Sequence, residues 1–123
     1  MGRSGRERNL VKPGYSPRQR DLLWLDFTPQ AGHEQAGRRP ALVISQDEYN
    51  RKTGLLLACP ITSRKKGYPF EVDLPSGLEI EGVVLADQVR NLDWKARQAV
   101  FIEELDDDTF SEVIGKLNAL IGE

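Results

Sequence analysis

Apolar residues in this chain gather in short runs that turn residues separate, a pattern typical of β-strands. Residues 22–27 form a nearly continuous apolar run of strand length. Further strands are predicted at residues 40–44, 55–61, 69–74, 80–86 and 97–102. The strand at 69–74 alternates, with Phe70, Val72 and Leu74 on one face. Residues 46–54 form a polar connection with room for a short helix.

Two prolines constrain the predicted strands. Pro40 is expected to be the first residue of its strand, because a proline cannot donate to a ladder of hydrogen bonds. Pro60, near the end of the next strand, indicates an edge position or a bulge for the same reason.

The hydrophobic period changes near the C-terminus and predicts a helix. Apolar residues recur there at helical spacing, at Phe110, Val113, Ile114, Leu117, Leu120 and Ile121. Residues 106–108, all aspartate, supply an N-cap and complement the helix dipole, and Gly122 stands where a C-terminal cap is expected. Many short strands without crossover helices favour a mainly β fold, a small antiparallel barrel with one C-terminal helix.

Composition and length fit one soluble domain. The 123 residues suffice for a single core. Residues 1–20 are charged and poor in apolar side chains, so we expect a flexible N-terminal extension and a domain over residues 21–123. The segment has no apolar region of a secretory signal, and no window has the length of a membrane span. A single cysteine, Cys59, fits a reducing cytoplasm and is read as a buried apolar residue.

The net charge of −2 argues by itself against a nucleic-acid partner, but the charge is unevenly distributed. Residues 1–66 hold thirteen Lys or Arg against six Asp or Glu, whereas residues 67–123 hold four against thirteen. Such asymmetry is a weak indication of a surface that faces a polyanion.

The residues that could carry chemistry lie in two polar segments, residues 34–39 and 62–66. One histidine excludes a nuclease with two catalytic histidines, and no His/Cys cluster has metal-ligand spacing, so no metal or cofactor is expected. Strand alternation sends Arg38 and Arg39 to opposite sides, and we favour Arg39, next to Pro40, for a cleft. The basic run Arg64–Lys65–Lys66 is equally well explained as a solubilising turn.

Four motifs in order resemble the MazF/PemK toxins, the toxin halves of bacterial toxin–antitoxin pairs. They are Glu34-Gln35-x-Gly37-x-Arg39-Pro40, Pro60-Ile61-Thr62-Ser63, Gly67-Tyr68-Pro69-Phe70-Glu71-Val72 and Asp87-Gln88-Val89-Arg90. The resemblance covers residues 21–121. It implies a homodimeric SH3-like barrel and a metal-independent, sequence-specific endoribonuclease for single-stranded RNA, with a MazE-like antitoxin as partner. Trp24 and the apolar strands, read as packing and interface surface, also favour a homodimer.

Carried over by position, Arg39 and Thr62 match the family's catalytic Arg and Thr, and Glu34 matches a glutamate of its active-site loop. Phe27, Lys66, Gln88 and Arg97 match positions that line the RNA groove in relatives. The predicted substrate-binding set is Phe27, His33, Gln35, Arg38, Ser63, Arg64, Lys65, Lys66, Gln88, Arg90 and Arg97. His33 and Arg38 depart from the shared pattern, so the cleaved sequence does not follow from the resemblance.

Cleavage without a metal uses the 2′-hydroxyl of RNA as the nucleophile. Glu34, the only carboxylate near the site in the sequence, is the expected base, and Arg39 is expected to stabilise charge on phosphorus. Thr62 is expected to hold a phosphate oxygen or the 2′-hydroxyl. His33 either protonates the leaving oxygen or is only solvated. Two other functions stay open: a CcdB-like toxin that binds a protein such as gyrase, and a barrel that only binds RNA.

Overall fold

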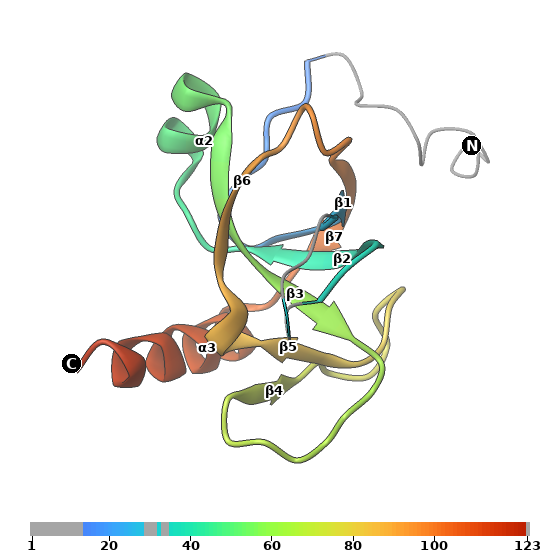
Figure 1. Ribbon diagram of the computed structural model, residues 1–123, viewed down its shortest axis with the longest axis vertical. Coiled ribbons are helices and arrows are strands. Elements are labelled where there is room, and N and C mark those ends of the chain that lie inside the picture. Colours follow the sequence, from blue (N-terminus) through green and yellow to red (C-terminus); the bar gives the residue numbers. More distant parts are fainter. Residues whose placement is uncertain (1–13, 29–31, 33–34, 123) are drawn as a thin grey trace.

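The computed structural model describes residues 14–28, 32 and 35–122. Short antiparallel strands form a coiled sheet, and a helix lies across one of its ends (Figure 1). The strands are β1 (Asp21–Asp26), β2 (Arg38–Val43), β3 (Leu55–Thr62), β4 (Glu71–Asp73), β5 (Val83–Leu85), β6 (Arg90–Asp93) and β7 (Val100–Glu104). The helices are α2 (Asp47–Thr53), the 3₁₀ turn η1 (Ala86–Gln88) and α3 (Asp107–Leu120). The predicted mainly β fold with a C-terminal helix is confirmed.

β3 is the strand that the rest of the sheet shares. The strand order is β4-β5-β3-β2-β1-β7, and β6 pairs with the first half of β3, from Leu55 to Ala58. β5 pairs with its end, at Ile61 and Thr62. The path from β4 to β7 makes this a barrel in open form, since the described residues show no pairing between those two strands. The strand β6 was not predicted, because only one of its four residues, Leu92, is apolar.

The two prolines occupy positions other than those predicted. β2 begins at Arg38, so Pro40 lies inside the strand, opposite Trp24 of β1. Its missing N–H is tolerated because the ladder from β2 to β3 begins only at Ala41. Pro60 lies in the central strand and not at an edge. On one side of β3, however, β6 ends opposite Ala58 and β5 begins opposite Ile61, so Pro60 lies in the gap between these two partner strands.

Strand alternation divides the apolar residues between two cores. Along β2, Leu42 enters one core while Ala41 and Val43 enter the other. The first core also holds Cys59 and receives Val113 of α3, so the C-terminal helix covers that side. Burial, together with the charge of Asp87, raises the pKa of Cys59 to about 12. The prediction that Cys59 is a buried apolar residue is confirmed.

The caps of α3 agree with the sequence. The Asp106 carboxylate accepts a hydrogen bond from the Thr109 backbone N–H at 2.9 Å, which satisfies an amide of the first turn. The same contact lowers the pKa of Asp106. After the helix, Gly122 takes a φ of 88°, the left-handed conformation that ends many helices. None of the helices in the described part of the chain has both the length and the apolar character of a membrane span.

Residues 14–20 belong to the packed structure. The Tyr15 hydroxyl donates to the Asp21 carboxylate at 2.8 Å, and its ring packs against Phe101 of β7 at 6.0 Å between centroids. Pro17 is buried, and its carbonyl accepts from the Asn50 side chain at 3.0 Å. The packed chain therefore begins before residue 21, where the sequence placed the domain boundary. Residues 1–13 lie outside the described residues, and the flexible extension stays a prediction there.

Candidate active site

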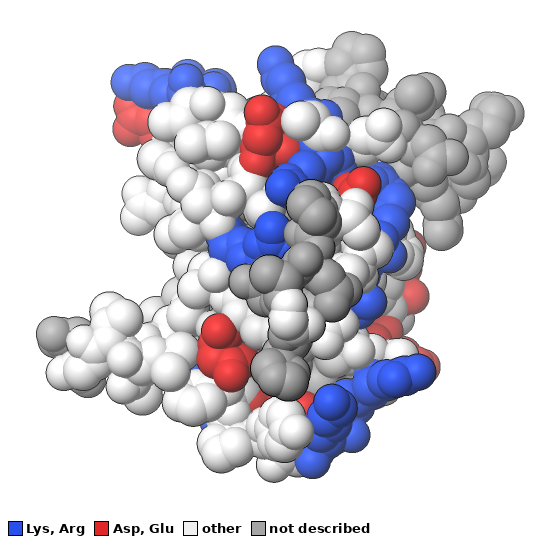
Figure 2. All heavy atoms as spheres, in the orientation of Figure 1, with Lys and Arg blue, Asp and Glu red and all other residues white. Residues whose placement is uncertain are grey.

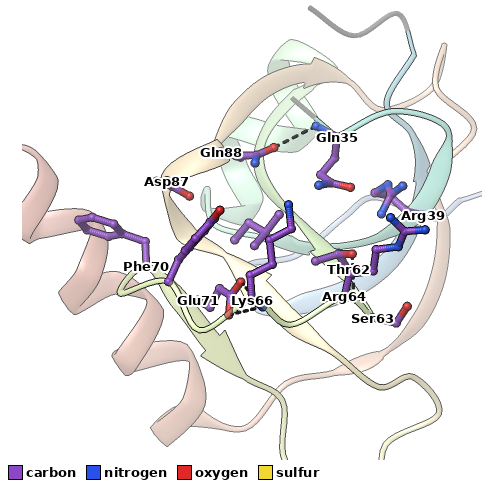
Figure 3. A pocket seen from close by; sticks show the side chains of 12 residues that line it. Gln35, Arg39, Thr62, Ser63, Arg64, Lys66, Phe70, Glu71, Asp87 and Gln88 are labelled. Atoms are coloured by element: carbon purple, nitrogen blue, oxygen red, sulfur yellow. Dashed lines mark hydrogen bonds between the residues drawn. The ribbon is translucent and has the colours of Figure 1, made fainter. Parts of the chain in front are cut away.

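Arg39 and Thr62 face each other across two neighbouring strands. The register of β2 on β3 pairs Val43 with Ala58 and Ala41 with Pro60. Continued by two residues, it sets Arg39 opposite Thr62. Cross-strand partners present their side chains on one face of a sheet, and both side chains line the same pocket (Figure 3).

Backbone carbonyls hold the Arg39 guanidinium in place. Its Nε donates to the carbonyl of Ala36 at 2.9 Å, and its Nη1 donates to that of Ile61 at 3.5 Å. Burial lowers the pKa of Arg39, yet an arginine stays protonated in a protein. The site therefore holds a fixed, partly desolvated cation, whose planar fork matches two oxygens of a phosphate.

Thr62 is nearly buried, with 8% of its surface exposed. Its Oγ1 accepts a hydrogen bond from the backbone N–H of Arg64 at 3.1 Å, which sets the direction of the hydroxyl. A hydroxyl that accepts in this way can donate its own proton to another acceptor. Thr62 thus offers a positioned donor beside the guanidinium of Arg39.

The pocket around this pair has a volume of about 570 Å³. Its wall combines cations, amides, carboxylates and aromatic rings (Figure 3). The lining residues are Gln35, Arg39, Thr62, Ser63, Arg64, Lys66, Tyr68, Phe70, Glu71, Leu85, Asp87 and Gln88. Of the predicted site residues, the structure thus brings together Gln35, Arg39, Thr62, Ser63, Arg64, Lys66 and Gln88.

Two carboxylates of β4 fix the basic turn after β3. The Glu71 carboxylate accepts from the backbone N–H groups of Lys66 at 3.0 Å and Gly67 at 2.9 Å. The Asp73 carboxylate lies 2.9 Å from the ammonium of Lys65. Lys66 lines the pocket whereas Lys65 does not, so the role of Lys65 in binding RNA stays a prediction. Strand-like alternation sends the two neighbouring lysines to different sides.

A hydrogen bond joins the chain before β2 to the far wall of the pocket. The backbone N–H of Gln35 donates to Oε1 of Gln88 at 3.0 Å (Figure 3). Gln88 ends the 3₁₀ turn η1, and Gln35 lies four residues before Arg39. This contact ties the loop that leads to Arg39 to the opposite side of the site.

Three arginines predicted to bind RNA, Arg38, Arg90 and Arg97, donate hydrogen bonds to backbone carbonyls in this structure. Arg38 donates to the carbonyl of Gln98 at 2.6 Å, and Arg97 donates to those of Asp26 and Thr28 at 3.0 and 2.8 Å. None of the three lines the pocket around Arg39. Arg38 and Arg39 do diverge, as strand alternation predicts.

The partly buried Arg90 contacts the buried Phe27 away from this pocket. The Arg90 guanidinium donates to the Phe27 carbonyl at 3.0 Å and lies 5.8 Å from the centre of its ring. The Phe27 side chain is fully buried in the second core, so it does not face an RNA groove here. The apolar run of β1 continues through this residue, which explains its burial better than the match to relatives does.

His33 and Glu34 lie outside the described residues, so their places in the site stay predictions. Within the described residues, no group of three or more His, Cys, Asp or Glu side chains is arranged to hold a metal ion.

Five residues that line the pocket were not predicted as site residues from the sequence: Tyr68, Phe70, Glu71, Leu85 and Asp87. Phe70 was taken as a strand residue, because the strand was predicted at residues 69–74, but β4 begins only at Glu71. The signal was present in the Gly-Tyr-Pro run, since Gly67 and Pro69 are turn formers. A longer turn would have moved both aromatic rings to the surface beside the basic residues.

Basic side chains on the surface form several groups with acidic and uncharged residues between them (Figure 2). The face drawn in Figure 2 is therefore not uniformly basic, despite the charge asymmetry of the sequence. Ion pairs link the two halves of the chain: Lys65 pairs with Asp73, and Arg20 pairs with Glu104 and Asp107. The cations that line the pocket, and could bind an anion there, are Arg39, Arg64 and Lys66.

Comparison with known proteins agrees with these observations. Residues 18–121 match the family described as PemK-like, MazF-like toxin of type II toxin-antitoxin system. The endoribonuclease toxin MazF of Escherichia coli K12 is 49% identical over 108 residues, which cover 88% of this chain and 96% of that protein.

Two solved structures have a similar fold. The crystal structure of MazF (Form-I) from Deinococcus radiodurans has a TM-score of 0.86 and 59% identity over 89% of this chain and 99% of the other. A MazE–MazF crystal structure (Form-II) from the same organism has a TM-score of 0.78 and 53% identity, covering 88% and 97%.

Gly82 provides a test of how tightly Thr62 is packed. A Cβ at this position would lie 2.3 Å from the Thr62 carbonyl oxygen, and its φ of +134° strains any other residue. Gly82→Ala should therefore lower the free energy of unfolding by about 1–3 kcal/mol, the usual cost of overpacking. Urea denaturation of both proteins measures the difference.

Gly115 in α3 is the matched control, because a Cβ there meets no atom within 4 Å and its φ is helical. Gly115→Ala should raise the free energy of unfolding, by up to about 1 kcal/mol. Equal stability of Gly82→Ala and the wild type would contradict the close approach at Thr62.

Proposed function

The chain belongs to the family of PemK-like, MazF-like toxins of type II toxin–antitoxin systems, and on this premise we propose that it is an endoribonuclease. Its substrate is single-stranded RNA, which it cleaves at specific sequences without a metal ion. The observation that carries the proposal is the Arg39 cation opposite the Thr62 hydroxyl, in a pocket with the further cations Arg64 and Lys66. Such a pocket offers the positive charge and the hydrogen-bond donor that a negatively charged phosphodiester requires.

The proposed reaction is an attack of the 2′-hydroxyl oxygen on the adjacent phosphorus. The bond from phosphorus to the 5′-oxygen breaks, which leaves a 2′,3′-cyclic phosphate and a 5′-hydroxyl. Arg39 stabilises the charge that builds up on the two non-bridging oxygens, since its fork is already held by the carbonyls of Ala36 and Ile61. Thr62 donates its hydroxyl proton to one of these oxygens.

Two protons must move in this reaction, one from the 2′-hydroxyl to a base and one to the leaving 5′-oxygen. We retain Glu34 as the proposed base and His33 as a proposed acid. The pocket adds two carboxylates, Glu71 and Asp87, that lie far from Glu34 in the sequence. Glu71 is occupied by the backbone of the basic turn, and Asp87 lies on the side of the pocket away from Arg39, so Glu34 remains the proposed base.

The proposal includes two protein partners. A relative was crystallised as a MazE–MazF complex, and we propose that an antitoxin with an acidic segment covers the pocket of this chain. We also propose a homodimer, because the apolar side chains of Phe101 and Ile121 are 47% and 73% exposed. The proposed site of action is the cytoplasm, where the messenger RNA is found.

The proposed reaction predicts cleavage of RNA in the presence of EDTA and no cleavage of DNA, because only RNA has the nucleophile. A substrate with a single 2′-deoxy sugar at the cut position should resist cleavage there and be cut elsewhere. Gel analysis of end-labelled RNA measures both. Cutting at the 2′-deoxy position would overturn the mechanism, and inhibition by EDTA would overturn the metal-free step. Binding of RNA without any cleavage would favour an RNA-binding barrel.

Arg39→Ala should lower the cleavage rate by roughly 10²–10³, the scale for loss of one preorganised charge-stabilising group. Arg39→Lys should restore only part of it, because an ammonium cannot contact two oxygens in a plane. Single-turnover kinetics measures the rates. Arg38→Ala is the matched control: the neighbouring arginine contacts the carbonyl of Gln98 outside the pocket, so its single-turnover rate should stay near that of the wild type. A rate near the wild-type value for Arg39→Ala would remove this site from the mechanism.

Lys66 and Lys65 form a matched pair for the binding of anions. Lys66→Glu should weaken the binding of both RNA and antitoxin, and should reduce the salt slope for RNA by roughly 0.7, the value for one phosphate of a single strand. Lys65→Glu should have a smaller effect, because Lys65 lies outside the pocket and already pairs with Asp73.

Fluorescence anisotropy of each ligand at several salt concentrations measures these effects. Loss of RNA binding by Lys66→Glu with unchanged antitoxin affinity would show that the two ligands do not share this part of the pocket.

A further inference from the structure

Tyr68 is an aromatic side chain on the wall of the pocket with 60% of its surface exposed. Phe70, two residues later, also lines the pocket but is only half-exposed. Apolar packing does not account for the position of Tyr68, since most of its ring faces solvent. Proteins that bind single-stranded RNA use exposed aromatic rings beside cations as stacking surfaces for bases.

The turn holds the backbone of Tyr68 in place before any ligand arrives. The Tyr68 carbonyl accepts from the backbone N–H of Glu71 at 3.1 Å. The Glu71 carboxylate in turn binds the backbone N–H groups of Lys66 and Gly67, the two residues before the tyrosine. The backbone is thus tied down on both sides of Tyr68, so little ordering of the chain is needed when a base stacks on the ring.

Lys66 supplies the charge that a nucleotide needs beside such a ring. Its ammonium lies 5.8 Å from the centre of the Tyr68 ring. A base and its own phosphate are similarly close neighbours in a nucleotide, so one turn offers a flat face and a cation together. The Arg39–Thr62 pair lies on the opposite side of the pocket from Phe70 and Asp87 (Figure 3). Tyr68 lines the same pocket as the Arg39–Thr62 pair, so its ring is available to a nucleotide next to a phosphate bound at Arg39.

We propose that Tyr68 is a substrate-positioning residue that stacks on a nucleobase flanking the cleaved phosphodiester of single-stranded RNA, a role that rests on the proposed ribonuclease function. Stacking accepts any base, because every base has a π face. Tyr68 therefore fixes where the strand lies relative to Arg39, whereas polar groups such as Asp87 and Gln88 read the edge of the base.

The test measures kcat and KM for RNA cleavage by Tyr68→Ala and Tyr68→Phe. Tyr68→Ala should lower kcat/KM by roughly 5- to 150-fold, the range for removal of one base-stacking ring. Most of this should appear as a higher KM. Tyr68→Phe should stay near the wild type, because the ring and not the hydroxyl makes the contact. Tyr49→Ala is the matched control, as Tyr49 is 39% exposed on α2 and does not line the pocket.

An RNA series with one abasic nucleotide at each position near the cut identifies the stacked base. At that position, removal of the base and Tyr68→Ala should not add, since each removes the same contact. Full multiplication of the two effects at every position would overturn the proposal. So would an unchanged KM for Tyr68→Ala, and loss of antitoxin binding with normal RNA kinetics would assign the ring to a protein interface instead.

The binding of RNA with a 2′-deoxy sugar at the cut separates this inference from the proposed function. Wild-type protein that binds this RNA through Tyr68 but cleaves no RNA would overturn the nuclease and leave the stacking role intact. Wild-type protein that cleaves RNA, with Tyr68→Ala equally active, would overturn the stacking role alone. A wild type that neither binds nor cleaves RNA would overturn both.

Discussion

The end of the pairing between β2 and β3 is the constraint on which the site depends. The ladder ends at Ala41 and Pro60, because Pro40, the next residue of β2, has no N–H to donate to Ile61. The two strands still run side by side, so Arg39 and Thr62 remain partners in register. The guanidinium of Arg39 reaches the Ile61 carbonyl there, in place of a backbone donor. Pro40 thus ends the pairing of the two strands just before the place where a cation and a hydroxyl face each other.

Arginine has two uses in this fold, and the sequence does not distinguish them. Arg38, Arg90 and Arg97 donate to backbone carbonyls at the end of β1 and in the turn before β7. Arg39 makes similar contacts but lies on the wall of a pocket. Alternation along β2 separates Arg38 from Arg39, so this choice could be made from the sequence. The partners of Arg90 and Arg97 are more than sixty residues away along the chain, and only the fold brings them together.

The same reasoning explains how much of the structure could be predicted. Long apolar runs such as β1 and β3 and the helical period of α3 were clear, because local pattern decides them. The four-residue strand β6 and the short strand β4 depend on tertiary pairing and were missed or drawn too long. In the site, Lys65 and Lys66 look alike in the sequence. Their different roles follow from β4, whose Asp73 takes one lysine while Glu71 holds the backbone of the other.

Acidic residues near the pocket would be expected to repel a polyanion such as RNA. Their contacts show that two of them, Glu71 and Asp73, bind the basic turn. Their charges shape that turn instead of facing a ligand. Asp87 differs, since it is exposed on the side of the pocket away from Arg39 (Figure 3). A carboxylate there repels a phosphate but accepts a hydrogen bond from the amino group of a base. In the proposed reaction the phosphate would therefore lie at Arg39 and the base toward Asp87, so the charge pattern of the pocket would give a bound strand one orientation.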